Sequence, residues 1–171
     1  MNFLELQLKI EKAARKAFEE IRARHADQRL CGYALYTDSD AITVCPAANS
    51  ERNLNRMMAD DPDDSVYYRW SPGEWDHEFE GAQHFEEISA LLEKEVGNIV
   101  RPQHHAEFKS QVHEACVLAL ENLRREGYFS NNSVDTVVVF GIGGGESEKE
   151  KDWIARLNDP LMAAQFIEWV T

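Results

Sequence analysis

The chain has 171 residues, of which 43% are hydrophobic and 29% are charged, and its net charge is −13 at pH 7. This length suits a single domain over 1–171 with a buried core, and no run approaches the roughly 20 apolar residues that span a bilayer. The acidic balance excludes ordinary nucleic-acid-binding proteins, which need basic surfaces to hold phosphates. Residues 1–18 are charged throughout and lack the apolar stretch of a signal peptide, so we expect a cytoplasmic protein.

Hydrophobic periodicity and turn residues predict the elements of the first part of the chain. Apolar residues recur at helical spacing from Phe3 to Ile21, and Asn2 precedes them as a helix cap. Two apolar strands then flank a turn, and a serine precedes a short polar helix. The predicted elements are, in order, a helix over 3–24, a hairpin over 31–46 that turns at Asp38-Ser39, a helix over 51–59 capped by Ser50, a loop over 60–64 and a strand over 65–70.

The stretch Ser71-Pro72-Gly73-Glu74 has the pattern of a helix start. Ser71 is a typical N-cap residue, Pro72 suits the first helical position and Glu74 falls at the capping-box position. We therefore predict a helix from Pro72 onward. Trp75 and Phe79 are four positions apart, so they are expected to share its inward face.

The remainder of the chain alternates helical patterns with one more apolar strand. Four helices are predicted, over 83–96, 103–126, 148–157 and 160–170, with a strand over 134–142. Because the early strands follow each other as a hairpin, we expect a mixed, mostly antiparallel sheet of about four strands with helices packed on it. The predicted fold class is α+β, in a single domain.

The glycine-rich segment over 141–146 follows a strand, as phosphate-binding loops do, but it lacks their other residues. Glu146 stands where the dinucleotide fingerprint needs its third glycine, and no lysine follows as in a P-loop. The neighbouring acids would also repel a phosphate. We expect no bound nucleotide and a turn at Gly143-Gly145 into a helix capped by Ser147 and Glu150. A lid or a partner-contact loop is the alternative.

The histidines and cysteines lack the spacing of a metal site or a catalytic nucleophile. His104 and His105 are adjacent and would face different directions on a helix, and His77 has no second histidine four positions away. We therefore expect solvated histidines, no metal, no cofactor and no enzymatic activity. The three cysteines are too few for a disulfide framework, so we expect reduced, mostly buried thiols.

The segment over 60–81 combines clustered acids with aromatic side chains. Residues 57–100 hold twelve acids and two basic residues, so they carry most of the net charge. The predicted strand would place Tyr67 and Trp70 on opposite faces of a sheet. Two interpretations stay open: aromatic residues in the core beneath a solvated acidic surface, or an acidic interaction face with an aromatic anchor. The second predicts that a protein partner binds Asp60, Asp61, Asp63, Asp64, Tyr67, Trp70, Glu74, Trp75, Asp76, Glu78 and Glu80.

Three motifs resemble those of a bacterial family of unknown function, domain family 4303. They are the strand and turn from Tyr33 to Asp38, the stretch from Cys45 to Asn49, and the tryptophan-rich element from Arg69 to Trp75. The helix end over 121–129 is also similar to that family. The similarity covers residues 3–160, and the tryptophan-rich element is its most specific part.

The resemblance implies a role as an immunity protein encoded beside a polymorphic toxin. It carries over no catalytic residues, because none are defined for the family. Together with the acidic segment, it predicts a cytoplasmic immunity protein that binds and neutralises a basic antibacterial toxin domain. The alternatives are a general protein-binding module without a toxin partner and, less favoured, an enzyme with an unrecognised site.

Overall fold

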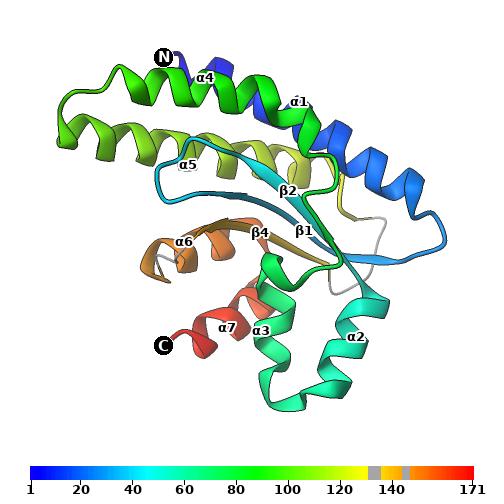
Figure 1. Cartoon of the computed structure of the whole chain (residues 1–171). Coiled ribbons are helices and arrows are strands. Elements are labelled where there is room, and N and C mark those ends of the chain that lie inside the picture. Colours follow the sequence, from blue (N-terminus) through cyan, green and yellow to red (C-terminus); the bar gives the residue numbers. More distant parts are fainter. Residues whose placement is uncertain (131–135, 144–146) are drawn as a thin grey trace.

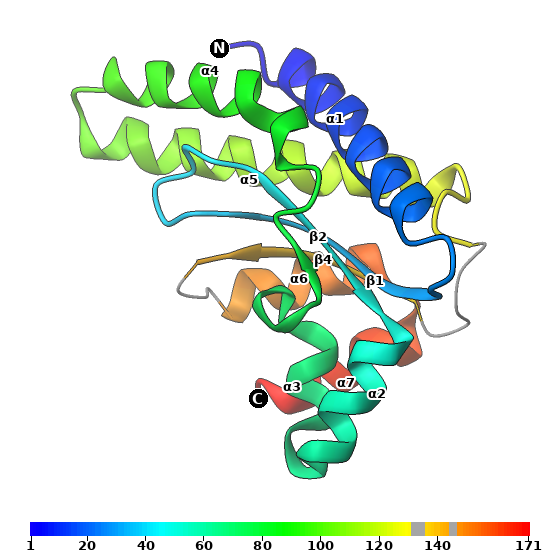
Figure 2. The same ribbon diagram turned by 45° about the vertical axis from the view of Figure 1, so that its right-hand side comes forward.

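The computed structural model describes residues 1–130, 136–143 and 147–171, and it has three layers. A central sheet lies between α1, α4 and α5 on one face and α3 and α7 on the other, with α6 along one edge (Figures 1 and 2). The two termini lie on opposite sides of this sheet (Figure 1). The α+β class is therefore confirmed.

The sheet has the strand order β3-β2-β1-β4. β1 (Leu30–Thr37) pairs antiparallel with β2 (Cys45–Ser50) and parallel with β4 (Val137–Ile142). The short β3 (His77–Glu78) pairs antiparallel with β2. The predicted hairpin and the mostly antiparallel sheet are thus confirmed.

Asp38 holds the hairpin loop. Its carboxylate accepts hydrogen bonds from the backbone nitrogens of Asp40 and Thr43, each at 2.8 Å. Burial alone would raise the pKa of Asp38, but these bonds and one from the Thr43 hydroxyl keep it below its usual value. The loop is therefore ordered by a charged side chain rather than by a glycine.

The helices begin and end close to their predicted positions, except near residue 70. The Asn2 side chain caps α1 by accepting from the Glu5 nitrogen, and the Ser50 hydroxyl caps α2 by accepting from the Asn53 nitrogen. The confirmed helices are α1 (Phe3–Arg24), α2 (Glu51–Asp60), α4 (Glu86–Gly97), α5 (Pro102–Arg125), α6 (Ser147–Leu157) and α7 (Pro160–Trp169).

Alternating strand residues supply two hydrophobic clusters, one on each face of the sheet. Tyr33 and Phe140 belong to the cluster that packs against α1 and α5. Ala34 and Val139 belong to the smaller cluster, which α3 and α7 cover. Both faces are therefore buried, which explains the nearly continuous apolar run in β4.

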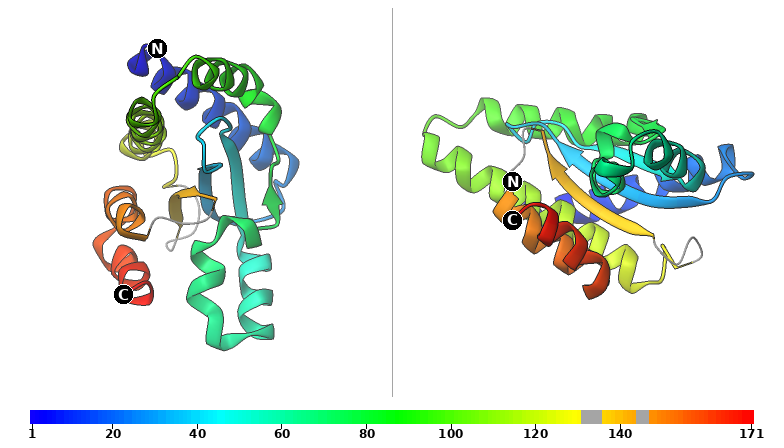
Figure 3. Two further views of the ribbon diagram at one scale, coloured as in Figure 1. Left: turned by 60° about the vertical axis from the view of Figure 1, so that its left-hand side comes forward. Right: turned by 90° about the horizontal axis from the view of Figure 1, so that it is seen from below.

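The predicted strand over 65–70 is wrong, because α3 (Ser65–Trp70) is a helix. Helical spacing places Val66 and Trp70 together, and both join the smaller hydrophobic cluster beneath α7. This packing outweighs the strand preference of a segment rich in tyrosine, valine and tryptophan. The helices α2 and α3 form a pair that extends away from the sheet, and residues 60–64 connect them at its far end (Figure 3).

The predicted helix from Pro72 is also wrong. Only a short 3₁₀ turn forms over Pro72–Glu74, the Ser71 side chain makes no capping hydrogen bond, and Trp75 is extended. The chain continues into β3, whose His77 pairs with Ala48 of β2. Sheet pairing and burial of the Trp75 indole therefore outweigh a local capping pattern.

Trp75 and Phe79 do not share a face, contrary to prediction. Trp75 is 4% exposed and packs against Gly32 of β1, where an added Cβ would lie 2.9 Å from the indole. Phe79 is 55% exposed and has a left-handed backbone, with φ of 62°. Trp75 is thus a core residue, and Gly32 is required by its close approach.

The cysteines are free, with Cys31 and Cys116 buried and Cys45 half-buried, as predicted. Burial raises the pKa of the Cys31 thiol to about 12, which leaves it unreactive. The expectation of solvated histidines is wrong for two of them. His77 is buried beside β2, and His113 is buried on α5 against Phe140 and Trp153. The predicted turn at Gly143-Gly145 and the cap at Ser147 lie largely outside the described residues.

Candidate functional site

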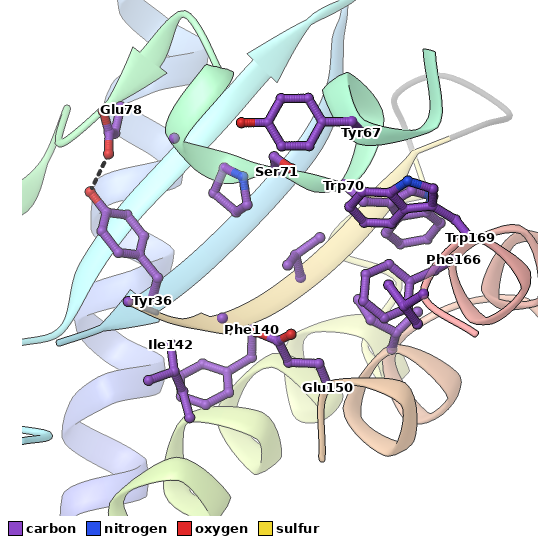
Figure 4. Close-up of a pocket in the computed structure, with 17 residues that line it drawn as sticks. Tyr36, Tyr67, Trp70, Ser71, Glu78, Phe140, Ile142, Glu150, Phe166 and Trp169 are labelled. Atoms are coloured by element: carbon purple, nitrogen blue, oxygen red, sulfur yellow. Dashed lines mark hydrogen bonds between the residues drawn. The ribbon is translucent and has the colours of Figure 1, made fainter. Parts of the chain in front are cut away.

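A groove of about 560 Å³ opens beside the end of β4 (Figure 4). It is lined by α3 and the following 3₁₀ turn, by α6 and α7, and by the end of β4. Gly141 of β4 lies at its floor, where an added Cβ would meet no atom closer than 4.0 Å. The missing side chain leaves the space between the walls unfilled.

Aromatic side chains from α3 and α7 form one wall of the groove. Tyr67 and Trp70 are three positions apart on α3, and Phe166 and Trp169 are three apart on α7, so each pair shares a helix face. The Trp70 and Phe166 rings lie 5.6 Å apart, and the Tyr67 and Trp169 rings lie 6.1 Å apart. Trp169 is 44% exposed, so this wall offers an aromatic surface to a ligand.

Carboxylates lie beside this aromatic wall. The Tyr36 hydroxyl donates to Glu78 Oε1 at 3.0 Å, and the Tyr67 hydroxyl donates to Glu74 Oε1 at 2.8 Å. Burial, with the bond to Glu78, raises the pKa of Tyr36, and the bond to Glu74 raises the pKa of Tyr67. Both phenols therefore stay protonated and fix the carboxylates in place. Glu150 extends from α6 toward the strand end (Figure 4).

The groove has the chemistry of a site for a cation with an apolar stem. Among its described lining residues none is basic, whereas Glu78 and Glu150 are acidic. Aromatic faces attract lysine and arginine groups through the ring quadrupole, and carboxylates pair with the same groups. Their combination favours a lysine or arginine side chain over an anion or a purely apolar group.

The structure separates the predicted partner-binding residues into four groups. Tyr67, Trp70 and Glu78 line the groove, and Glu74 bonds to Tyr67 at its rim. Trp75 is in the core. The loop acids lie at the far end of the α2–α3 pair, where Asp60, Asp63 and Asp64 are exposed and Asp61 is partly exposed.

The last two predicted residues hold other parts of the fold. The Asp76 carboxylate accepts from the Ser50 nitrogen at 3.0 Å and from the Ser50 hydroxyl at 2.6 Å, which ties β3 to the start of α2. Glu80 accepts from Arg24 at 2.6 Å, at the end of α1. Both residues are engaged within the chain, away from the groove.

Sequence reasoning missed half of the aromatic wall. Phe166 and Trp169 lie about a hundred residues after Tyr67, and only the packing of α7 against α3 brings them together. The one signal in the sequence was their spacing of three on a predicted helix. That spacing is equally typical of a buried core face.

The structure also brings metal-ligand types together that are far apart in the sequence. His25, His77 and Glu80 place one ligand atom each within 4.8 Å of one another. Burial lowers the pKa of His77, so its ring is neutral at neutral pH. No spacing rule could find this cluster, because His25 is the C-cap residue of α1 and the other two come from β3 and the turn after it.

No helix in the described part of the chain is long and apolar enough to cross a membrane. No curated protein and no solved structure matches the chain. A family model does: residues 10–159 match the one described as Domain of unknown function (DUF4303), over most of the chain's length. The chain therefore belongs to the DUF4303 family.

Proposed function

We propose that this is a cytoplasmic immunity protein, which binds a cognate antibacterial toxin domain and neutralises it by occupying its basic surface. The observation that carries the proposal is the groove, in which an aromatic wall stands beside carboxylates and no described lining residue is basic. Two further points agree with it: the immunity role that the resemblance to domain family 4303 implies, and the net charge of −13.

The groove would hold a lysine or arginine of the toxin. The stem of such a side chain would lie along Trp169 and Tyr67, and its charged head would approach Glu78 and Glu150. Side chains of this kind are common at basic surfaces that handle nucleic acids or nucleotides. Blocking them would stop the toxin without any chemistry by the immunity protein.

The acidic connection between α2 and α3 has a separate part in binding. Asp60, Asp63 and Asp64 are exposed at the far end of a helix pair that projects from the sheet. Clustered charge of this kind raises association rates through long-range attraction, whereas well-packed aromatic contacts set the lifetime of a complex. The proposal therefore assigns steering to this connection and anchoring to the groove.

Growth rescue tests the proposal. The proposal predicts that a toxin domain is encoded beside this gene, and this domain is to be expressed in a sensitive bacterium with the wild-type chain, with Trp169→Ala, or with Leu161→Ala. Leu161 is 81% exposed on the same helix and does not line the groove, so it is the matched control. Wild type and Leu161→Ala should restore growth, and Trp169→Ala should not. A wild-type chain that gives no protection, although it is soluble, contradicts the proposal.

A further inference from the structure

We infer that His25, His77 and Glu80 form a binding site for a divalent transition-metal ion, with Zn²⁺ as the ion of choice. The site lies on the α1 side of β3, whereas Glu78, the next residue after His77, lines the groove on the other side. It is therefore separate from the groove and independent of the proposed function.

The distances from Glu80 to the two histidines are close to those between neighbouring ligands of a tetrahedral zinc ion. Glu80 Oε2 lies 2.9 Å from His25 Nε2 and 3.2 Å from His77 Nδ1. Zinc bonds of about 2.0–2.1 Å to nitrogen and oxygen in a tetrahedron place neighbouring ligand atoms about 3.3 Å apart. The two imidazole rings stack with centroids 3.9 Å apart. Two imidazoles on one tetrahedral zinc ion have centroids about 5 Å apart, so binding requires the partly exposed His25 ring to swing outward.

Surrounding groups orient the ligands as they do in zinc sites. His77 Nε2 lies 2.9 Å from the Gln28 side-chain oxygen and 3.6 Å from an Asp76 carboxylate oxygen, and we assign the ring proton to this nitrogen because both neighbours accept hydrogen bonds. The lone pair of His77 is then on Nδ1, which faces Glu80 Oε2. A lone pair opposite a carboxylate oxygen is repulsive unless a proton or a metal ion lies between them, and with the ring proton on Nε2 the metal ion is the group that fits. Metal-bound histidines commonly donate their other N–H to an oxygen in this way.

Glu80 is divided between two partners. Its Oε1 accepts from Arg24 at 2.6 Å and lies 3.0 Å from His25 Nε2, while Oε2 faces both imidazoles, so the bond from Arg24 fixes the carboxylate against the two rings. The ligand set of two imidazoles and one carboxylate is one that zinc accepts in proteins, with a further position left for water. His25 and Glu80 are both partly exposed, which gives an ion access to the site.

The backbone that carries Glu80 is constrained. Phe79 before it has φ of 62° and Gly81 after it has φ of 84°, both in the left-handed region. An added Cβ on Gly81 would lie 2.7 Å from the Ala17 side chain, so the turn packs closely on α1. A non-glycine residue in this region is disfavoured, and such residues concentrate at ligand sites. The turn therefore fixes Glu80 opposite His25, the residue that caps the end of α1.

Titration calorimetry with ZnCl₂ on chelator-treated protein tests the site. Wild type should bind about one equivalent per chain. His25→Ala and Glu80→Gln should abolish that binding while the circular dichroism spectrum stays unchanged. Gln28→Ala removes only the orienting group and should weaken binding about 10- to 100-fold. His104→Ala, an exposed histidine outside the cluster, is the matched control and should bind as wild type does.

The outcomes separate the site from adventitious binding. Because His77 is buried, its removal could unfold the chain, and the decision rests on His25 and Glu80, which are partly exposed. The inference is overturned by a wild-type chain that binds no zinc, by a His25→Ala variant that binds as tightly as wild type, or by a loss of binding in His104→Ala. None of these results depends on whether the chain protects against a toxin.

Discussion

At the scale of single residues, Trp75 and Trp169 have the same side chain but different roles, because their surroundings differ. Trp75 is buried against Gly32, and its indole N–H donates to the Tyr68 carbonyl at 3.3 Å. Trp169 is nearly half exposed at the groove. One tryptophan therefore stabilises the fold, and the other is available to a partner.

Trp75→Ala should lower the free energy of unfolding by about 3–5 kcal/mol, the usual cost of emptying a buried aromatic site. Trp169→Ala should change it far less, because its side chain already contacts water. Urea melts of the two variants and wild type give the comparison. Equal destabilisation by both substitutions would mean that Trp169 is a core residue and that the groove is not a binding surface.

Two serines with similar sequence surroundings should also differ. The Ser50 hydroxyl accepts from the Asn53 nitrogen at 3.1 Å and donates to Asp76, so Ser50→Ala should cost about 1–2 kcal/mol. Ser71 makes no capping bond, so Ser71→Ala should stay within about 0.5 kcal/mol. Midpoints from urea melts decide between them, and a larger loss from Ser71→Ala would contradict the structure.

The three candidate helix caps show how much of the structure a local sequence pattern can predict. Asn2, Ser50 and Ser71 all precede plausible helix starts, and two of the three do cap helices. Ser71 does not, because Trp75 four positions later is buried on Gly32 and the chain is extended there. A capping pattern is local, whereas the contact of Trp75 with β1 spans more than forty residues of sequence.

At the scale of elements, β4 depends on one side chain at its outer edge. Asn158, at the end of α6, accepts from the Val138 nitrogen at 2.8 Å and donates to the Val138 carbonyl at 2.7 Å. It also donates to the Ile154 carbonyl at 3.0 Å. The side chain thereby satisfies backbone groups that β4 presents to no neighbouring strand, and it ties α6 to the sheet.

Asn158→Ala should therefore destabilise the chain, because it leaves a buried backbone donor and acceptor without partners, at about 1–3 kcal/mol for each group. Hydrogen exchange should locate the effect, with the largest loss of protection in β4 and α6 and little change in α1. Asn122→Ala, a partly exposed amide on α5, is the control and should leave β4 protected. Unchanged exchange at Val138 in Asn158→Ala would contradict this assignment.

The elements that sequence predicts well are long and periodic. The helices over 3–24 and 103–126 each carry an apolar stripe for six or more turns, and a single tertiary contact cannot overturn such a pattern. Residues 65–81 have no comparable run. Their structure is decided by α7, β2 and Gly32, which lie elsewhere in the chain, and local propensity gave the wrong element twice.

At the scale of the whole molecule, the exposed acidic residues and the aromatic groove lie in different parts of the structure. The acidic connection at 60–64 projects beyond the sheet on the α2–α3 pair, while the groove lies nearer the sheet, beside the end of β4 (Figures 3 and 4). Composition alone predicted that this segment is acidic and aromatic. The acidic connection and the aromatic groove are separated in space because α2 and α3 form a projecting helix pair, which no local pattern predicted.

The central claim is that the acidic connection over 60–64 steers a basic toxin domain to the protein and that the groove anchors it. Surface plasmon resonance against the toxin domain that the proposal predicts beside this gene, at several salt concentrations, tests it most directly. Replacing Asp60, Asp61, Asp63 and Asp64 with Asn should slow association and flatten its salt dependence, because salt screens long-range attraction. Trp169→Ala should instead speed dissociation and leave the salt dependence unchanged. A four-Asn variant that associates as fast as wild type at low salt, with no faster dissociation of Trp169→Ala, would contradict the claim.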